Sequence, residues 1–218
     1  MAGHGETGAM TPRERYRAQV RAEIKERAWE QIATAGVPAL SLNAVAKSMG
    51  LSGPALYRYY ASRDDLLTEL VRDAYASLAA TLRAAAATGA DLAGLAHALR
   101  GWALEDPQRY FLIYGTPVPG YHAPDDTTRI ASQIMAMLLD ASAALVPEGP
   151  PTLFGTHLDE HRDWADGHPA PSAALHRALS FWTRLHGVLS LELAGQFTGM
   201  GFDPAQLFAA ELRDLLTP

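Results

Sequence analysis

Apolar residues recur at helical spacing along almost the whole chain, and runs that alternate between apolar and polar residues, as strands do, are absent. From Tyr16 an apolar residue returns every fourth position through Val20, Ile24, Ala28 and Ile32, with charged residues between them. This pattern predicts an all-α fold. The 218 residues are enough for a small domain joined to a larger one.

Capping and breaking residues mark where the N-terminal helices begin and end. Gly36 ends the first helix, Ser41 begins a short one, Gly50 makes a turn, and Ser52 begins a second short helix with a proline in its first turn. Two short helices around a tight turn are typical of a helix-turn-helix, and the next helix, which begins after Ser62, supports them.

The same signals place the remaining helices and connections. Helices are predicted over residues 63–88, 91–105, 107–114, 126–146, 172–197 and 203–216. Residues 1–11 are predicted to be a disordered leader, and residues 147–171, which hold five prolines, are predicted to be mainly loop. We therefore predict a small helix-turn-helix domain at 12–62 and a larger helical domain at 63–218.

Charge is divided unevenly between these parts. The formal net charge of −6 argues against a nucleic-acid partner for the chain as a whole. Residues 10–72, however, hold ten Lys and Arg against seven Asp and Glu, a net charge of +3, whereas residues 73–218 carry −8. A basic module joined to an acidic one indicates a small part that meets phosphate and a larger part that does not.

Several classes of protein are excluded or disfavoured by what the sequence lacks. There is no Cys, which removes disulfide frameworks, thiol nucleophiles and Cys-based zinc sites. The first residues do not resemble a secretory signal, and no apolar run reaches the ~18 residues of a membrane span. We expect a cytoplasmic protein that does not enter a membrane.

The segment SLNAVAKSMGLSGPALYRYYASRDDLL, residues 41–67, has an inward and an outward face. Leu56 and Tyr60 are expected to pack inward from the second short helix. Small residues, two phenols and a guanidinium are left outward, a surface that suits the major groove of DNA. The outward residues are Gly53, Pro54, Ala55, Tyr57, Arg58 and Tyr59.

Gly36, Ser41, Val45-Ala46, Gly50-Leu51-Ser52, Leu56-Tyr57, Tyr60 and Leu66-Leu67 occur in the order and spacing of a family pattern. Over the segment that these positions span, residues 36–67, the chain resembles the TetR family of bacterial transcriptional regulators. The resemblance implies a homodimeric DNA-binding regulator, most often a repressor, that leaves a palindromic operator when a small-molecule effector binds. It implies no cofactor and no catalysis.

The resemblance also assigns DNA contacts. The family's phosphate-binding tyrosine falls on Tyr57, its usual His on Tyr59, its capping Thr on Ser41 and its usual Lys on Arg63. Two of these positions, Tyr59 and Arg63, depart from the pattern. The remaining contacts are assigned to the recognition helix and the residue facing it. The full set of implied DNA-binding residues is Ser41, Asn43, Ser52, Gly53, Pro54, Ala55, Tyr57, Arg58, Tyr59 and Arg63.

Trp182, His186 and Gly187 resemble the Trp-His-Gly signature of one C-terminal domain class of this family. The resemblance makes the last two helices the dimer contact, for which the sequence offers apolar stripes. These stripes are Leu185, Val188, Leu189, Leu193, Leu207, Phe208, Leu212 and Leu215. An effector pocket is implied in the same domain, and its candidate lining is Trp102, Tyr110, Phe111, Tyr114, Met135, Phe154, Phe181, Trp182 and His186.

Two other functions remain open at this point. One is a helical protein that binds a small molecule without any DNA activity. The other is a metal-using helical enzyme built on His157, His161, Asp159, Glu160 and His168. HLDEH does not have the HExxH spacing, and no nucleophile elbow or phosphate-binding glycine loop is present, so we predict no metal site and no enzyme.

Overall fold

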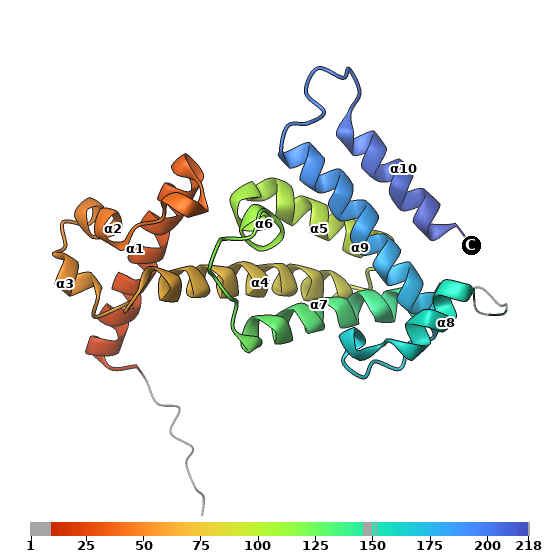
Figure 1. Ribbon diagram of the computed structural model, residues 1–218, viewed down its shortest axis with the longest axis horizontal. Coiled ribbons are helices and arrows are strands. Elements are labelled where there is room, and N and C mark those ends of the chain that lie inside the picture. Colours follow the sequence, from red (N-terminus) through yellow and green to blue (C-terminus); the bar gives the residue numbers. More distant parts are fainter. Residues whose placement is uncertain (1–9, 146–149, 151, 218) are drawn as a thin grey trace, which may run out of the picture. The chain divides into compact units, whose positions relative to one another are not determined.

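The computed structural model describes residues 10–145, 150 and 152–217, which form helices and no strand (Figure 1). The prediction of an all-α fold is therefore confirmed. The chain falls into two compact units that divide between Leu70 and Val71. Residues 1–9 of the predicted leader lie outside the described residues.

The N-terminal unit contains the predicted short helices. Its elements are α1 (Pro12–Ala35), η1 (Val37–Ala39), α2 (Leu42–Ser48), α3 (Gly53–Leu56) and the first turns of α4 (Arg63–Ala87). The buried side chains from these elements form its core. They include Ile24, Ala28, Ile32, Leu42, Val45, Leu56, Tyr60, Leu66, Leu67 and Leu70.

The apolar row predicted for α1 is buried only over its C-terminal half. Ile24, Ala28 and Ile32 are at most 1% exposed, but Tyr16 is 65% exposed. The start of this helix is fixed locally instead. Thr11 and Glu14 form a capping box in which the Thr11 hydroxyl accepts from the Glu14 N–H at 3.2 Å and the Glu14 carboxylate accepts from the Thr11 N–H at 2.7 Å.

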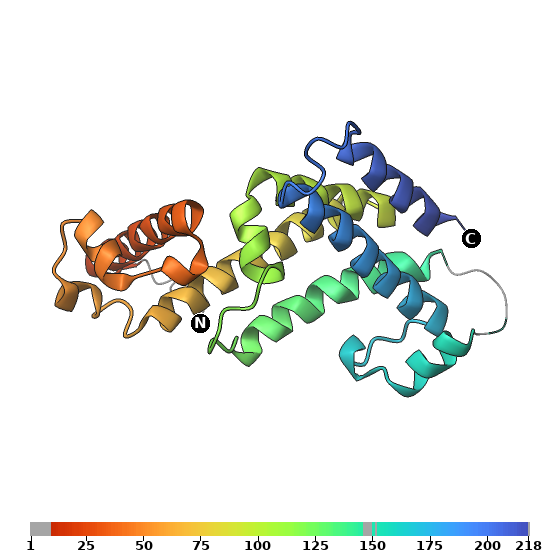
Figure 2. The same cartoon turned by 45° about the horizontal axis from the view of Figure 1, so that its top comes forward.

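The C-terminal unit is a layered set of helices around α9, which packs against α7, α8 and α10 (Figure 2). Besides the rest of α4, its elements are α5 (Leu92–Glu105), α6 (Pro107–Tyr114), α7 (Asp125–Ala143), α8 (Leu153–Glu160), η2 (Asp163–Ala165), α9 (Ser172–Leu193) and α10 (Pro204–Leu216). No described helix is both long and apolar enough to cross a membrane.

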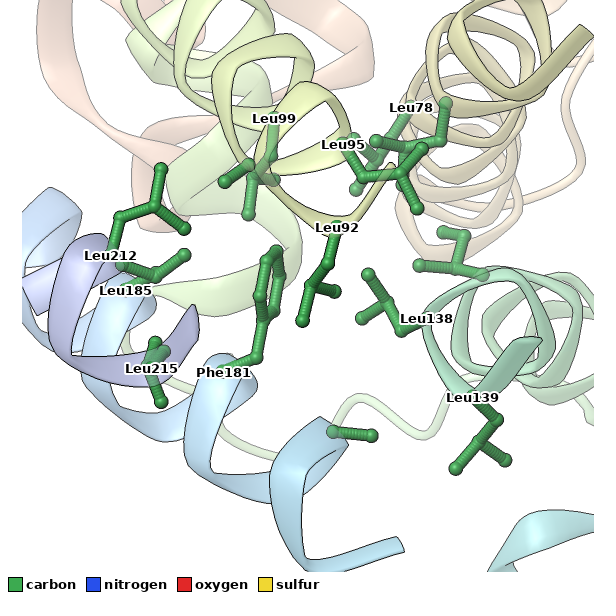
Figure 3. Packing of buried hydrophobic residues seen from close by; sticks show 14 of the residues in the cluster. Leu78, Leu92, Leu95, Leu99, Leu138, Leu139, Phe181, Leu185, Leu212 and Leu215 are labelled. Atoms are coloured by element: carbon green, nitrogen blue, oxygen red, sulfur yellow. The ribbon is translucent and has the colours of Figure 1, made fainter. Parts of the chain in front are cut away.

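The core of this unit is built mainly from leucines of α5, α7, α9 and α10 that surround Phe181 (Figure 3). This packing corrects the predicted dimer stripes. Leu185, Leu189 and Phe208 are at most 1% exposed within a single protomer, and Val188, Leu212 and Leu215 are also buried. Only Leu193 and Leu207 of the stripes are partly exposed. The apolar faces of α9 and α10 pack against each other and against α5. The six buried residues are therefore not available to a partner.

The segment from 147 to 171 is also corrected, because it contains the helix α8. Thr152 caps this helix through its hydroxyl, which accepts from the Gly155 N–H at 3.0 Å, and Leu158 is buried against the core. The prolines of the segment flank the helix and do not interrupt it. The prediction of a mainly loop segment therefore missed this helix, and residues 147–149 and 151 lie outside the described residues.

The helix predicted over 172–197 ends earlier, at Leu193. Gly195 adopts φ 71°, and two hydrogen bonds close the helix: Gly195 N–H donates to Glu192 O at 3.0 Å and Gln196 N–H donates to Leu191 O at 2.9 Å. This is a Schellman motif, in which a left-handed residue, usually glycine, satisfies the last carbonyls. The predicted helix ran past Gly195, although a glycine is a common helix stop signal.

Candidate functional site

The turn between α2 and α3 is closed by backbone hydrogen bonds. Gly50, at φ 66°, follows α2, and the N–H groups of Gly50 and Leu51 donate to Lys47 O at 3.2 Å and Ala46 O at 2.9 Å. Ser52 then caps α3, because its hydroxyl accepts from the Ala55 N–H at 3.3 Å. The helix-turn-helix is thus set by local capping.

α3 is shorter than the predicted second helix, because it ends at Leu56 and residues 57–59 follow as a turn, but the two residues predicted to pack inward are buried. Leu56 and Tyr60 are at most 2% exposed, whereas the Tyr57 side chain is 47% exposed and Arg58 is also exposed. Asn43 of α2 lies beside the start of α3, since a Cβ placed on Gly53 would be 3.5 Å from its side-chain oxygen. Tyr57, Arg58 and Asn43 are all exposed, so the helix-turn-helix presents a phenol, a guanidinium and an amide at its surface.

Two arginines of α1, which sequence reasoning did not single out, hold the end of α3. Arg17 donates to Arg58 O at 3.5 Å, and its guanidinium carbon lies 5.8 Å from the centre of the Tyr59 ring. Arg21 donates to Tyr59 O at 3.3 Å and pairs with Glu69 at 3.0 Å. These contacts fix the backbone at Arg58 and Tyr59 and add positive charge beside them.

Arg63 has a structural role that the prediction of a DNA contact did not include. Its Nε donates to Leu40 O at 3.1 Å and one Nη donates to Val37 O at 3.0 Å. The planar guanidinium can serve two carbonyls at once, which the ammonium of a lysine does less well. Arg63 therefore ties the start of α4 to the connection between α1 and α2.

In the C-terminal unit, α6 and α9 bring four of the predicted pocket residues together. Tyr110 is fully buried, and its hydroxyl lies 2.9 Å from Nδ1 of His186 and 2.8 Å from Oγ of Ser190. The centre of the His186 ring is 4.4 Å from that of Tyr114 and 4.2 Å from that of Trp182. We call Tyr110, Tyr114, Trp182, His186 and Tyr75 the aromatic cluster.

Tyr75 of α4 and Ser190 were missed by sequence reasoning. The Tyr75 ring packs edge-on against Tyr114 with 6.1 Å between the ring centres. Ser190 lies one helical turn after His186, so the i,i+4 spacing could have indicated that the two face the same way. Nothing in the sequence indicated Tyr75.

Two polar atoms of the aromatic cluster are buried and have no hydrogen-bond partner among the described residues. They are the hydroxyl oxygen of Tyr114 and Nε2 of His186. Burial lowers the pKa of His186 to about 4 and raises the pKa of the Tyr114 hydroxyl. Both groups are therefore neutral near pH 7, and each retains an unused capacity for a hydrogen bond.

The other predicted pocket residues lie elsewhere or serve the core. Trp102 is buried and donates through Nε1 to Ser77 Oγ at 3.1 Å, and Phe181 is fully buried in the leucine core. Phe111 packs on Tyr110, and Met135 packs against the core. Phe154 is 45% exposed on α8, against the ring of His176 rather than the aromatic cluster.

The histidines considered for a metal site have other partners. The rings of His157 and His161 stack with 4.2 Å between centres, and His168 contacts Asp140 at 3.1 Å. Within 10–145, 150 and 152–217 there is no group of three or more His, Cys, Asp or Glu placed to hold a metal ion.

Two family models match the chain. The model described as "Bacterial regulatory proteins, tetR family" matches residues 24–70, and the one described as "Tetracyclin repressor-like, C-terminal domain" matches residues 92–215. The HTH-type transcriptional regulator Rv1816 of Mycobacterium tuberculosis is 37% identical over 216 residues, which cover 92% of each chain.

Solved structures have the same fold. A crystal structure described as that of a regulatory protein, SCO4313, has 74% sequence identity and a TM-score of 0.89, and the match covers 95% of this chain and 100% of that one. A regulatory protein of the tetR family from Rhodococcus RHA1 has 18% identity and a TM-score of 0.53, with 91% and 95% of the two chains covered. The second likeness concerns the fold alone.

Proposed function

This chain belongs to the TetR family of bacterial transcriptional regulators, and we propose that it represses transcription as a homodimer released from a palindromic operator by a small-molecule effector. The observation that carries the DNA-binding part is the exposed pair Tyr57 and Arg58, which directly follows α3 in a net basic unit. Arg17 and Arg21 hold the carbonyls of Arg58 and Tyr59. A DNA-binding regulator of a bacterium acts in the cytoplasm, which is therefore the proposed localisation.

In this proposal the helix-turn-helix divides its contacts between phosphates and bases. Tyr57 and Tyr59 donate to phosphate oxygens, which sets the register but carries no sequence information. Arg58 reads a guanine in the major groove. The helix-capping serines and Arg63 contact the DNA backbone near the helix starts. The residues that approach base edges with small or amide side chains are Asn43, Gly53, Pro54 and Ala55.

We propose that α9 and α10 form the dimer contact through their outward faces rather than through their apolar stripes. Gly187 is exposed, and a Cβ placed there would meet no described atom within 4 Å. Thr183 and Leu191 lie on the same face of α9, one turn to either side of it. Small side chains allow two helices to approach closely, so this face suits a second copy of α9.

The aromatic cluster is the proposed effector site. It combines apolar ring surface with two buried, unused polar atoms, which is the composition of a small-molecule site. Tyr75, a member of the cluster, lies on α4. The first turns of the same helix contribute the buried residues Leu66 and Leu70 to the N-terminal unit. A ligand that binds one placement of α4 better than another weakens operator binding by that difference in affinity.

The test is selection of genomic DNA fragments bound by the full chain, followed by sequencing. We expect enriched fragments to share an inverted repeat with half-site centres about 34–36 Å apart, and binding to weaken linearly in a plot of log affinity against log salt. A promoter fused to a reporter then tells repression from activation. Activation would overturn the repressor part alone.

The matched control is the double variant Tyr57→Ala/Arg58→Ala. Both side chains are exposed, so the variant is expected to fold like the parent while losing the enrichment. If the parent and this variant select the same fragments, or if neither enriches any, the DNA-binding proposal is wrong. Binding of a small molecule by a chain that selects no DNA would favour the alternative function.

A further inference from the structure

The chemistry of the aromatic cluster identifies a class of ligand for the proposed effector site. The Tyr114 hydroxyl and His186 Nε2 belong to rings whose centres are 4.4 Å apart, and neither atom has a hydrogen-bond partner among the described residues. A buried polar group without a partner is costly, so a molecule that supplies both partners gains affinity. The two atoms together therefore define what the ligand must offer.

His186 Nδ1 is already engaged, which leaves Nε2 for a ligand. The Tyr110 hydroxyl contacts Nδ1 at 2.9 Å, Ser190 Oγ at 2.8 Å and the His186 carbonyl at 3.3 Å. The single phenolic hydrogen of Tyr110 can be donated to any of these, so Nε2 is a donor in one tautomer and an acceptor in the other. The Tyr114 hydroxyl can likewise donate or accept. A ligand hydroxyl has one hydrogen to donate and two lone pairs, so it can pair with both atoms as long as the Tyr114 hydroxyl donates when Nε2 accepts.

Charge on the ligand is disfavoured by the groups that surround these atoms. The titratable side chains in contact within the aromatic cluster are three tyrosines and His186, and burial lowers the pKa of His186 to about 4. A carboxylate that needed a protonated His186 would lose about a thousandfold in affinity at pH 7. A cation would meet no carboxylate among these contacts.

The rings determine the rest of the ligand. Trp182, Tyr114 and His186 pack on one another with 4.2 to 5.4 Å between ring centres. A ligand that reaches the two polar atoms therefore lies against aromatic rings, which favours an apolar, flat frame. Tyr114 is the last residue of α6 and is followed by the connection 115–124, which has no regular helix.

We propose that the aromatic cluster binds an uncharged, flat apolar molecule that carries a hydroxyl group, with the hydroxyl paired to Tyr114 and to His186 Nε2. This inference rests on the proposed function only in taking the cluster as the effector site. It selects alcohols and phenols on an aromatic frame, and it rejects the corresponding carboxylates.

The experiment is calorimetric titration of the full chain at pH 7 with probes of three sizes. The hydroxyl probes are phenol, 2-naphthol and 4-hydroxybiphenyl, and each is compared with its carboxylate and with the parent hydrocarbon. We expect at least one hydroxyl probe to bind at least tenfold more tightly than its hydrocarbon and a hundredfold more tightly than its carboxylate. Equal or tighter binding of a carboxylate would overturn the proposal, as would no binding of any hydroxyl probe up to millimolar concentration.

Two variants distinguish specific binding at the cluster from non-specific binding of apolar probes. Tyr114→Phe removes one oxygen and should cost the bound hydroxyl probe about tenfold while leaving the hydrocarbon unchanged. Tyr16→Phe, the same change at a side chain that is 65% exposed in the other unit, should change nothing. If the hydroxyl probe binds Tyr114→Phe as well as it binds the parent, the assigned pairing is wrong.

The same probes distinguish failure of this inference from failure of the proposed function. Fragments selected as above are titrated with protein in the presence and absence of the bound probe. A probe that binds at the cluster but leaves DNA affinity unchanged upholds the ligand class and contradicts release by an effector. DNA binding without any hydroxyl-probe binding upholds the regulator and overturns the ligand class.

Discussion

The hydroxyl of Tyr110 lies 2.9 Å from Nδ1 of His186, although 76 positions separate the two residues in the chain. This contact joins α6 to the middle of α9 and leaves Nε2 of the same imidazole without a partner among the described residues. One nitrogen of the ring is thus paired within the fold, and the other can form a hydrogen bond with a ligand.

Tyr110→Phe and Tyr114→Phe should differ in their effect on stability although each removes one buried hydroxyl. Loss of the Tyr110 hydroxyl removes the contacts to His186 and Ser190 and should lower the free energy of unfolding by about 1–3 kcal/mol. Loss of the Tyr114 hydroxyl removes no hydrogen bond and should leave stability unchanged or slightly raised. Urea unfolding measures both, and equal losses would contradict the assigned partners.

Stability should fall on acidification because of His186. Burial lowers its pKa in the folded state to about 4, below the 6.5 of an unperturbed His, so the unfolded chain binds the proton first. The contribution is fully present above pH 6.5 and is lost as the pH falls towards 4, with an upper magnitude of about 3 kcal/mol. Unfolding of the parent and of His186→Gln across this range should differ in slope, whereas His122→Gln, at an exposed position, should follow the parent.

Arg63→Lys should destabilise the N-terminal unit even in the absence of DNA. The shorter, non-planar ammonium of lysine matches the two carbonyls of Val37 and Leu40 less well, and for a partly exposed group we expect a loss of about 1 kcal/mol. Thermal unfolding followed by circular dichroism checks this, with Arg13→Lys at an exposed position as the control. An unchanged melting temperature would indicate that Arg63 is free to act mainly on DNA.

Arg58→Ala and Tyr57→Phe should weaken DNA binding in different ways. Arg58→Ala should reduce discrimination at one guanine of the operator by about 1–3 kcal/mol, whereas Tyr57→Phe should weaken all sequences to a similar extent. Fluorescence anisotropy with the selected operator and single-base variants of it measures both. A uniform loss with Arg58→Ala would make it a phosphate contact, and an unchanged affinity with Tyr57→Phe would remove that hydroxyl from the interface.

Gly187→Leu should separate the subunits without unfolding them. A Cβ at this position meets no described atom within 4 Å of its own protomer, so the leucine clashes only with a partner. Gly101→Leu is the matched control, because Gly101 is also helical, exposed and unobstructed but lies on α5. Light scattering at micromolar concentration should show a monomer for the first variant and a dimer for the second. If both variants are dimers, the interface does not include Gly187.

The sequence alone determined the features that depend on neighbours a few residues apart. The caps at Ser41, Ser52 and Asp203 and the turn at Gly50 were readable because a cap joins residues two or three positions apart. The inward placement of Leu56 and Tyr60 followed from helical periodicity in the same way. These local rules were sufficient for the all-α fold and the helix-turn-helix.

Only the tertiary structure decided which apolar and polar surfaces were used internally. Leu185 and Leu212 belong to the protomer core and not to a dimer stripe, and Arg63 binds carbonyls more than twenty positions away. The helix α8 stands where proline content predicted a loop, because burial of Leu158 against the core favours it. Periodicity tells which face of a helix is apolar but not what covers that face, because the covering surface comes from distant parts of the chain.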